Sequence, residues 1–238
     1  MSSISVNFLG RFGNQMFQYA VARAYAELHQ ASFHTKPWVG QKIFELSDQP
    51  FKQLPEVGFD ELPFGKTNIT LHGHFLFDEA TKILSLQKLR QWFRLQSRWQ
   101  NLVDQKEIVA HLRWGDFAQS GAYCLITKES YINACHKYNL NHNNLTWVGE
   151  DINNQVILNG ELSFLPDFIV LMKAKTILRA NSSFSWWAAT LNIGSVYSPI
   201  VEARVGWNNV EFVPGNWPRI ADGSKFTCRL SDLHLAQK

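Results

Sequence analysis

The chain has 238 residues, 45% of them hydrophobic, which is enough for a globular core in one large or two small domains. A formal charge of +3 from 23 basic and 20 acidic residues, with no Lys/Arg run, argues against a nucleic-acid partner. Three scattered cysteines, no signal-peptide pattern and no apolar stretch long enough for a membrane span lead us to expect a cytoplasmic protein, with peripheral membrane association left open.

The start of the chain has the pattern of a strand, a glycine turn and a helix. Residues 4–9 alternate apolar and polar side chains, and residues 14–30 carry an apolar stripe at helical spacing after the interruption at 10–13. This order predicts a Rossmann-like βα unit. The proline-rich segment 31–66 has little periodicity, so we expect loops and short elements there.

The rest of the chain reads more regularly. A strand is expected at 67–77, an amphipathic helix at 84–99 and a polar linker at 100–106. The elements expected after the linker are strands at 107–113, 145–149, 176–180 and 195–198 and helices at 128–138, 167–175 and 182–193. Because strands alternate with helices, the pattern predicts an α/β fold with a parallel, doubly wound sheet. We place the domain boundary between residues 104 and 105.

Three segments could carry chemistry, and the first is Gly10-Arg-Phe-Gly-Asn-Gln15. A tight glycine turn between a strand and a helix directs backbone N–H groups and the helix dipole at an anion. The segment lacks the last glycine of the dinucleotide fingerprint and the Lys-Ser/Thr of a P-loop. A simple β-to-α turn is therefore an equally good interpretation.

The second segment is His111-Leu-Arg-Trp-Gly-Asp116, at the carboxyl end of a strand expected to be buried. Ligands bind at this end of open parallel sheets. Arg113 would be a permanently charged fork for two phosphates, His111 a hydrogen-bond partner, and Asp116 either an acceptor or a base toward a hydroxyl. The structural alternative is an ion pair between Arg113 and Asp116.

The third segment, Asn181-Ser-Ser-Phe-Ser-Trp-Trp187, also follows a strand and opens a helix. Ser182 and Ser183 would occupy the N-cap and first turn, where hydroxyl and free N–H groups favour a phosphate. The structural alternative is an ordinary serine cap with the tryptophans in the core.

The sequence contains no Asp-x-Asp, the pattern by which many nucleotide-sugar enzymes hold a divalent cation. His72-Gly-His74 could be a metal pair, but two histidines without a third ligand are more often structural. We therefore expect no metal and no cofactor, and a resident cation in place of the metal.

Extended to Gly10–Ala20, His111–Phe117 and Asn181–Leu191, the three segments resemble the α-1,2-fucosyltransferase family, glycosyltransferase family 11, in order and spacing. The resemblance continues in Ser195-Val-Tyr-Ser-Pro199 and Val213-Pro-Gly-Asn-Trp217. It implies a GT-B-like fold, with two Rossmann-type domains whose parallel sheets face a central cleft. It also implies inverting, metal-independent transfer of fucose from GDP-fucose to a glycan hydroxyl, α-1,2 to galactose. Residues 1–104 would form the acceptor side and residues 105–238 the donor side.

The resemblance also implies roles for individual residues. Arg113 would contact the diphosphate, and as our own hypothesis Arg113 and Asp116 are the catalytic residues, with Asp116 as the base. His111 and Asp116 would support the donor site, and the other expected donor-site residues are Asn14, reaching in from the first domain, Asp151, Asn181, Ser182, Ser183 and Phe184.

Two departures from the family matter. Arg113-Trp114 stands where the family usually has two adjacent arginines, so a second cation is missing or comes from elsewhere. The chain is also shorter than typical members, mostly in the acceptor-side domain.

Three alternatives to this assignment stay open. Asp78 or Glu79 could serve as the base in place of Asp116. The whole chain could instead be a protein O-fucosyltransferase-like enzyme, or a catalytically silent GDP- or carbohydrate-binding module.

Overall fold

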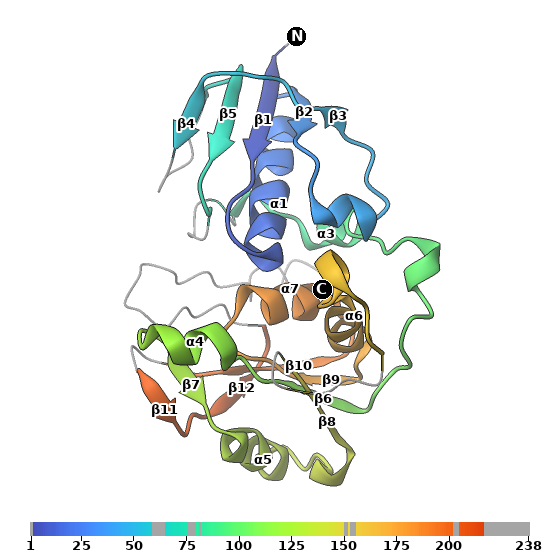
Figure 1. Ribbon diagram of the computed structural model, residues 1–238, viewed down its shortest axis with the longest axis vertical. Helices are drawn as coiled ribbons and strands as arrows, with labels where there is room; N and C mark the ends of the chain where they lie inside the picture. Colours follow the sequence, from blue (N-terminus) through green and yellow to red (C-terminus); the bar gives the residue numbers. More distant parts are fainter. Residues whose placement is uncertain are drawn as a thin grey trace. The chain divides into compact units, whose positions relative to one another are not determined.

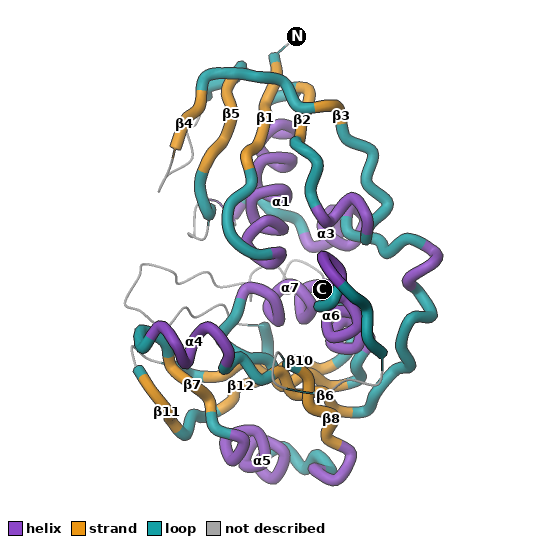
Figure 2. Tube along the Cα trace, in the orientation of Figure 1, coloured by secondary structure: helices purple, strands orange, loops and turns teal. Residues whose placement is uncertain are grey.

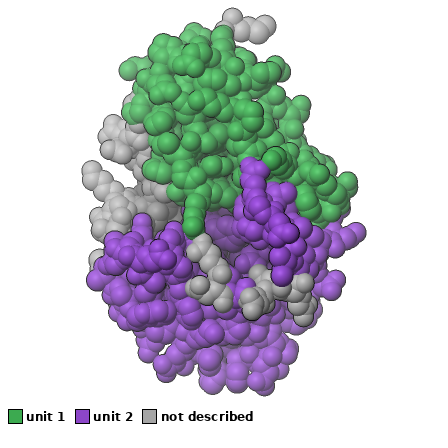
Figure 3. Space-filling view, viewed as in Figure 1, with its two compact units in different colours: residues 1–99 green, residues 100–238 purple. Residues whose placement is uncertain are grey.

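The computed structural model of the chain describes residues 2–58, 65–75, 80, 82–149, 152, 156–201 and 205–216. The chain divides into two compact units, residues 1–99 and 100–238 (Figure 3). The division falls at the start of the polar segment 100–106, five residues before the boundary we expected. Lys173 holds this segment to the second unit, because its Nζ donates to the carbonyl oxygens of Gln100 (3.1 Å) and Val103 (2.7 Å).

The first unit opens with strand β1 (Ser3–Asn7), a glycine turn and helix α1 (Phe12–Leu28), as the sequence predicts. Gly10 has a φ of +68° in this turn, and a Cβ added there would lie 2.8 Å from Asn14 Nδ2. The conformation and the close approach both favour glycine.

A parallel five-stranded sheet forms the rest of this unit, in the order β3-β2-β1-β5-β4 (Figure 1). The other strands are β2 (Ser32–Thr35), β3 (Gln49–Pro50), β4 (Glu56–Gly58) and β5 (Ile69–His72). Three of these strands lie in the segment 31–66, where we expected loops and short elements, and they have two to four residues. Helix α3 (Leu86–Trp92) is shorter than predicted and is followed by a 3-10 helix at Ser97–Trp99.

The helix α1 packs its apolar stripe on the sheet and carries a buried polar group, Tyr19. The Tyr19 ring stacks on Trp38 at 5.1 Å between centroids, and its hydroxyl donates to Asp48 Oδ1 at 2.8 Å. Burial raises the pKa of the Asp48 carboxyl, while the Tyr19 hydrogen bond and the Arg23 charge oppose this shift.

The second unit contains a five-stranded sheet in the order β12-β10-β9-β6-β8. Its strands are β6 (Ile108–His111), β8 (Leu145–Val148), β9 (Thr176–Leu178), β10 (Ser195–Pro199) and β12 (Phe212–Pro214). All pair in parallel except β12, which is antiparallel to β10. A separate parallel pair is formed by β7 (Cys124–Ile126) and β11 (Gly206–Asn208).

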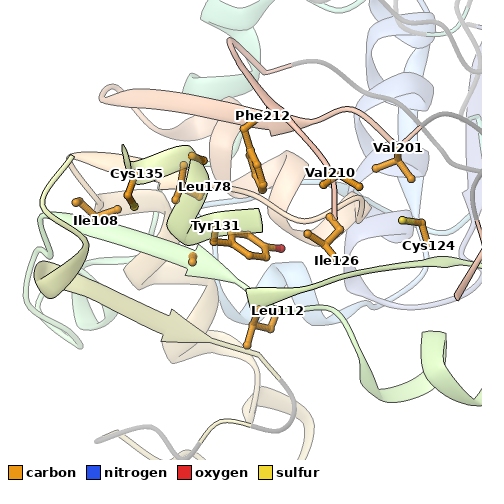
Figure 4. Close-up of a cluster of buried hydrophobic side chains, with 12 residues drawn as sticks. Ile108, Leu112, Cys124, Ile126, Tyr131, Cys135, Leu178, Val201, Val210 and Phe212 are labelled. Atoms are coloured by element: carbon orange, nitrogen blue, oxygen red, sulfur yellow. The ribbon is translucent and has the colours of Figure 1, made fainter. Parts of the chain in front are cut away.

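Helices cover both faces of this sheet (Figures 1 and 2). Helix α5 (Lys128–Lys137) lies on one face, and α6 (Leu165–Lys173) and α7 (Ser183–Leu191) lie on the other. The ring of Tyr131 from α5 sits among buried apolar side chains that include Ile126 and Phe212 (Figure 4). Among the described residues, no helix is long and apolar enough to cross a bilayer.

Candidate functional site

The topology of the second unit brings two of the predicted segments together. The chain runs from β6 to β8 on one side and then crosses to β9 on the other side of β6. In open α/β sheets, ligands bind at the carboxyl edge beside such a switch. Because Ala110 of β6 stands opposite Leu178 of β9, residues 111–116 and 179–184 leave the sheet side by side at this edge.

A glycine shapes the neighbouring end of β8. Gly149 has a φ of +150°, and a Cβ added there would lie 2.3 Å from the carbonyl oxygen of Leu112. The backbones of β6 and β8 therefore meet more closely at this edge than a side chain would allow.

His111 ends β6 and is 4% exposed. Its carbonyl oxygen accepts the Tyr131 hydroxyl at 2.7 Å, and its ring lies 5.4 Å from that of Phe184. Phe184, in the first turn of α7, also packs edge-on against Phe168 of α6 at 5.4 Å. The aromatic contact thus joins the end of β6 to the start of α7.

Arg113 and Asp116 form the ion pair that the sequence left open as the structural alternative. Arg113 Nη2 lies 2.7 Å from Oδ1 and 2.8 Å from Oδ2 of Asp116, which belongs to helix α4 (Gly115–Ser120). The Arg113 side chain is 13% exposed and that of Asp116 is 44% exposed. The guanidinium carbon lies 5.0 Å from the centre of the Phe117 ring. The guanidinium is therefore held in a fixed orientation at the strand end.

Trp114 occupies the position where a second adjacent cation was expected by resemblance. Its Nε1 donates to the carbonyl oxygen of Ile126 at 2.9 Å, and its ring lies 5.0 Å edge-on from Trp207. Lys128 Nζ lies 5.7 Å from the centre of its ring. Trp114 thus packs with β7 and β11.

The N-terminus of α7 is capped as the sequence predicts. Ser182 is the N-cap, and its Oγ accepts from the backbone N–H of Phe184 at 3.2 Å. No acidic residue lies in the first turn of this helix. Asn181, 7% exposed, donates from Nδ2 to the carbonyl oxygen of Cys124 at 3.2 Å. Ser183 is the first helical residue, and the N–H groups of this turn carry the positive end of the helix dipole.

Sequence reasoning missed Arg179, which follows β9 and is 2% exposed. Its Nε donates to Ser198 Oγ at 2.8 Å, and its Nη1 donates to the carbonyl oxygen of Ala180 at 2.9 Å. The available signal was an arginine inside the segment 176–180, which we expected to be a buried strand. A charged side chain in such a strand requires a specific reason.

The structure of the second unit does not test the remaining predicted residues. Asn14 is in the first turn of α1, in the first unit, beside Gly10. Asp151, Asp78 and Glu79 lie outside the described residues, and so does Trp217 of the last family segment.

Metal ligands do not cluster in the part of the chain that the structure describes: no group of three His, Cys, Asp or Glu could hold an ion there. The histidine pair considered from the sequence includes His72, whose Nδ1 lies 4.0 Å from Glu56 Oε2. Asn7 donates to the same carboxylate. These contacts make a polar cluster at the carboxyl ends of β1 and β5.

Comparison with protein families decides the assignment. The family model described as glycosyl transferase family 11 matches residues 36–213, well over half of the chain. The chain belongs to this family. The match includes both strand-end segments of the second unit, while the glycine turn at 10–15 lies before it. The family resemblance is therefore confirmed, and the chain is a glycosyltransferase by family. No curated protein matches its sequence.

Solved structures agree on the fold. The α-1,6-fucosyltransferase NodZ soaked with GDP-fucose is 12% identical, covering 90% of this chain and 100% of its own, with a TM-score of 0.56. NodZ co-crystallised with GDP is 12% identical over 91% of this chain and 100% of its own, with a TM-score of 0.55. The fucosyltransferase NodZ from Bradyrhizobium is 12% identical, covering 90% and 99%, with a TM-score of 0.55. The predicted GT-B-like α/β fold is confirmed, while the central cleft stays a prediction.

Proposed function

We propose that this glycosyltransferase is an inverting, metal-independent fucosyltransferase that uses GDP-fucose and forms an α-1,2 linkage to a galactose hydroxyl of a glycan. The observation that carries the proposal is the convergence of a fixed guanidinium, Arg113, and the serine-capped N-terminus of α7 at one switch point. Both groups favour phosphate oxygens. The GDP-fucose and GDP named for the NodZ structures support a guanine-nucleotide donor for a chain of the same fold.

The proposed donor site stabilises the leaving group with fixed charges. Arg113 binds two oxygens of the diphosphate, and the positive end of the α7 dipole favours further oxygens at its first turn. His111 and Asn181 support the pocket from the strand ends, and Phe184 lines it. Because these groups are already oriented, they stabilise the negative charge that develops on the β-phosphate without reorganising. Such electrostatic stabilisation is usually the largest single contribution to catalysis.

The transfer step that we propose is a single displacement. The acceptor hydroxyl oxygen attacks the anomeric carbon of fucose from the face opposite the diphosphate, while the bond from that carbon to the β-phosphate oxygen breaks. GDP departs with the bonding pair, and the hydroxyl proton passes to a carboxylate. We assign this carboxylate to Asp116, whose side chain is 44% exposed at the strand edge. Asp78 or Glu79 and the departing phosphate itself are the alternatives.

In this proposal each unit binds one of the two substrates. We place the donor in the second unit and the glycan acceptor in the first, with Asn14 reaching the donor from the glycine turn and Asp151 contacting guanine or ribose. A cytoplasmic location, metal independence and the absence of a cofactor belong to the same proposal.

Turnover of GDP-fucose with a glycan array, in the presence and absence of EDTA, tests the function. We expect transfer to galactose-terminated glycans that EDTA leaves unchanged. Thermal shift with GDP, UDP and CMP provides the donor control, and stabilisation by UDP or CMP but not by GDP would refute the donor assignment. Calorimetric binding of GDP without transfer or hydrolysis would identify a silent binding module instead. Transfer to a folded protein domain but not to glycans would favour a protein O-fucosyltransferase.

A further inference from the structure

A buried arginine lies directly behind the N-terminal turn of α7. Arg179 follows strand β9, and its Nη1 donates to the carbonyl oxygen of the next residue, Ala180, at 2.9 Å. The same carbonyl accepts from Ser185 Oγ, in the first turn of α7, at 3.1 Å. The guanidinium and the helix turn are thus joined through one backbone oxygen. On its other side, Arg179 Nε is held by Ser198, which itself donates to the Gly215 carbonyl at 2.7 Å.

This cation has no anion beside it in the part of the chain that the structure describes. Arg179 forms no ion pair with any of these residues, and its buried Nη2 meets no hydrogen-bond partner among them. Burial lowers the pKa of Arg179 to about 9, with the nearby Tyr131 acting in the opposite direction, so the group is still charged at neutral pH. A buried, unpaired charge is destabilising, because the lost hydration is not replaced.

The contact that this charge shares with the first turn of α7 suggests what offsets it. Helix α7 has nine residues and no acidic side chain in its first turn. The helix dipole and the guanidinium therefore add positive potential at the same turn. An anion bound there would interact with both, and the low dielectric around Arg179 strengthens its part.

We propose that Arg179 is a positioning residue whose buried guanidinium acts through the first turn of α7 to give the donor site its preference for a diphosphate over an uncharged nucleoside. The inference rests on the proposed donor site and deepens it. The guanidinium does not contact the ligand. It binds the Ala180 carbonyl oxygen and keeps the electrostatic potential at the first turn of α7 positive. Arg179 thus supplies a second cation from behind the helix, while Arg113 supplies the first from the end of β6.

The ratio of the guanosine and GDP dissociation constants tests this inference, because guanosine lacks the diphosphate charge. Both constants are measured by calorimetry for wild type and R179M, which keeps the length of the apolar stem. We expect R179M to lower the preference for GDP about tenfold or more, with guanosine affinity within about twofold of wild type. K175M is the matched control: it removes one exposed cation four residues away, and its GDP preference should stay unchanged.

R179K completes the test, because it keeps the charge with fewer hydrogen bonds. We expect the GDP preference of R179K to lie within about threefold of wild type. If R179M does not fold, R179K is the variant that tests the inference. An unchanged GDP preference in R179M, including equal weakening of GDP and guanosine, would overturn the inference. A loss of GDP preference of about tenfold or more in R179K would also overturn it. If the wild type itself shows no preference for GDP, the proposed donor site fails and this inference fails with it.

Discussion

Substitution of Arg113 by lysine separates leaving-group stabilisation from fold stability. The Arg113 side chain is 13% exposed, so its charge acts in a largely desolvated place. The guanidinium is already held by Asp116, because Arg113 Nη2 lies 2.7 Å from Oδ1 and 2.8 Å from Oδ2. Lysine keeps a point charge but loses the paired N–H bonds to phosphate oxygens. By analogy with loss of one oxyanion donor, we expect kcat to fall about 10²–10³-fold, or about 2.7–4 kcal/mol.

The expected loss of stability is much smaller. The Asp116 carboxylate is 44% exposed and can be hydrated when its partner is shortened, so the lost ion pair should cost at most about 1 kcal/mol. Steady-state kinetics with GDP-fucose, together with thermal unfolding, measure both effects on the same samples. The smaller effect on ground-state binding should appear as a modest change in GDP affinity.

The partner variant D116N distinguishes the two roles open to Asp116. If the carboxylate only orients Arg113, D116N should lose less activity than R113K, whereas loss of the general base should cost about 10²–10⁴-fold. An R113K enzyme within about threefold of wild type, or wild-type activity abolished by EDTA and restored by Mn²⁺, would refute the reasoning that Arg113 replaces a metal.

The other predictions concern the cap, the strand edge and a buried carboxyl. S182A should lose about 0.5–2 kcal/mol of stability and also bind GDP more weakly than wild type. The control T127A, which removes the corresponding cap of α5, should lose stability only. If S182A and wild type bind GDP with equal affinity, Ser182 is a helix cap and has no phosphate role. G149A should be about 1–3 kcal/mol less stable in urea unfolding, because its Cβ meets the Leu112 carbonyl at a positive φ, and a variant as stable as wild type would contradict this. Because burial raises the folded-state pKa of Asp48, the native state binds its proton more tightly than the unfolded chain does. The stability of wild type relative to D48N should therefore rise as the pH falls from above that raised pKa toward the ordinary value, and a pH-independent difference in urea unfolding would refute it.

The regular elements of the fold were predictable because their periodicity extends over many residues. The 17-residue helix Phe12–Leu28 and the nine-residue helix Ser183–Leu191 lie within two residues of the expected bounds. Strands β2, β3 and β4, which have two to four residues, are too short for alternation to be visible, and their pairing with distant strands creates them. Helix α4 has six residues and ends at Gly121 in the left-handed region, so it too gives no periodic signal.

The parts of the site that could be predicted are those whose residues stand at a recognisable strand end or helix start in the sequence. Arg113 at a strand end and Ser182 before a helix are local signals, and both lie where expected. The Arg113–Asp116 ion pair could not be distinguished from a phosphate site by spacing, because both interpretations need the same two residues. Arg179 was missed because its partners, such as Ser198, come from a strand that the sequence does not place beside it.

The outer strands of the two sheets are short, and this limits association between copies of the chain. Strand β3 has two residues and ends in proline, β4 has three, β12 has three and also ends in proline, and β8 has four. An exposed strand edge invites pairing with another polypeptide, which is a common start of aggregation, and short edges or proline weaken it. At each of these edges a second molecule would gain at most a few backbone hydrogen bonds. The short outer strands therefore protect the protein against edge-to-edge aggregation.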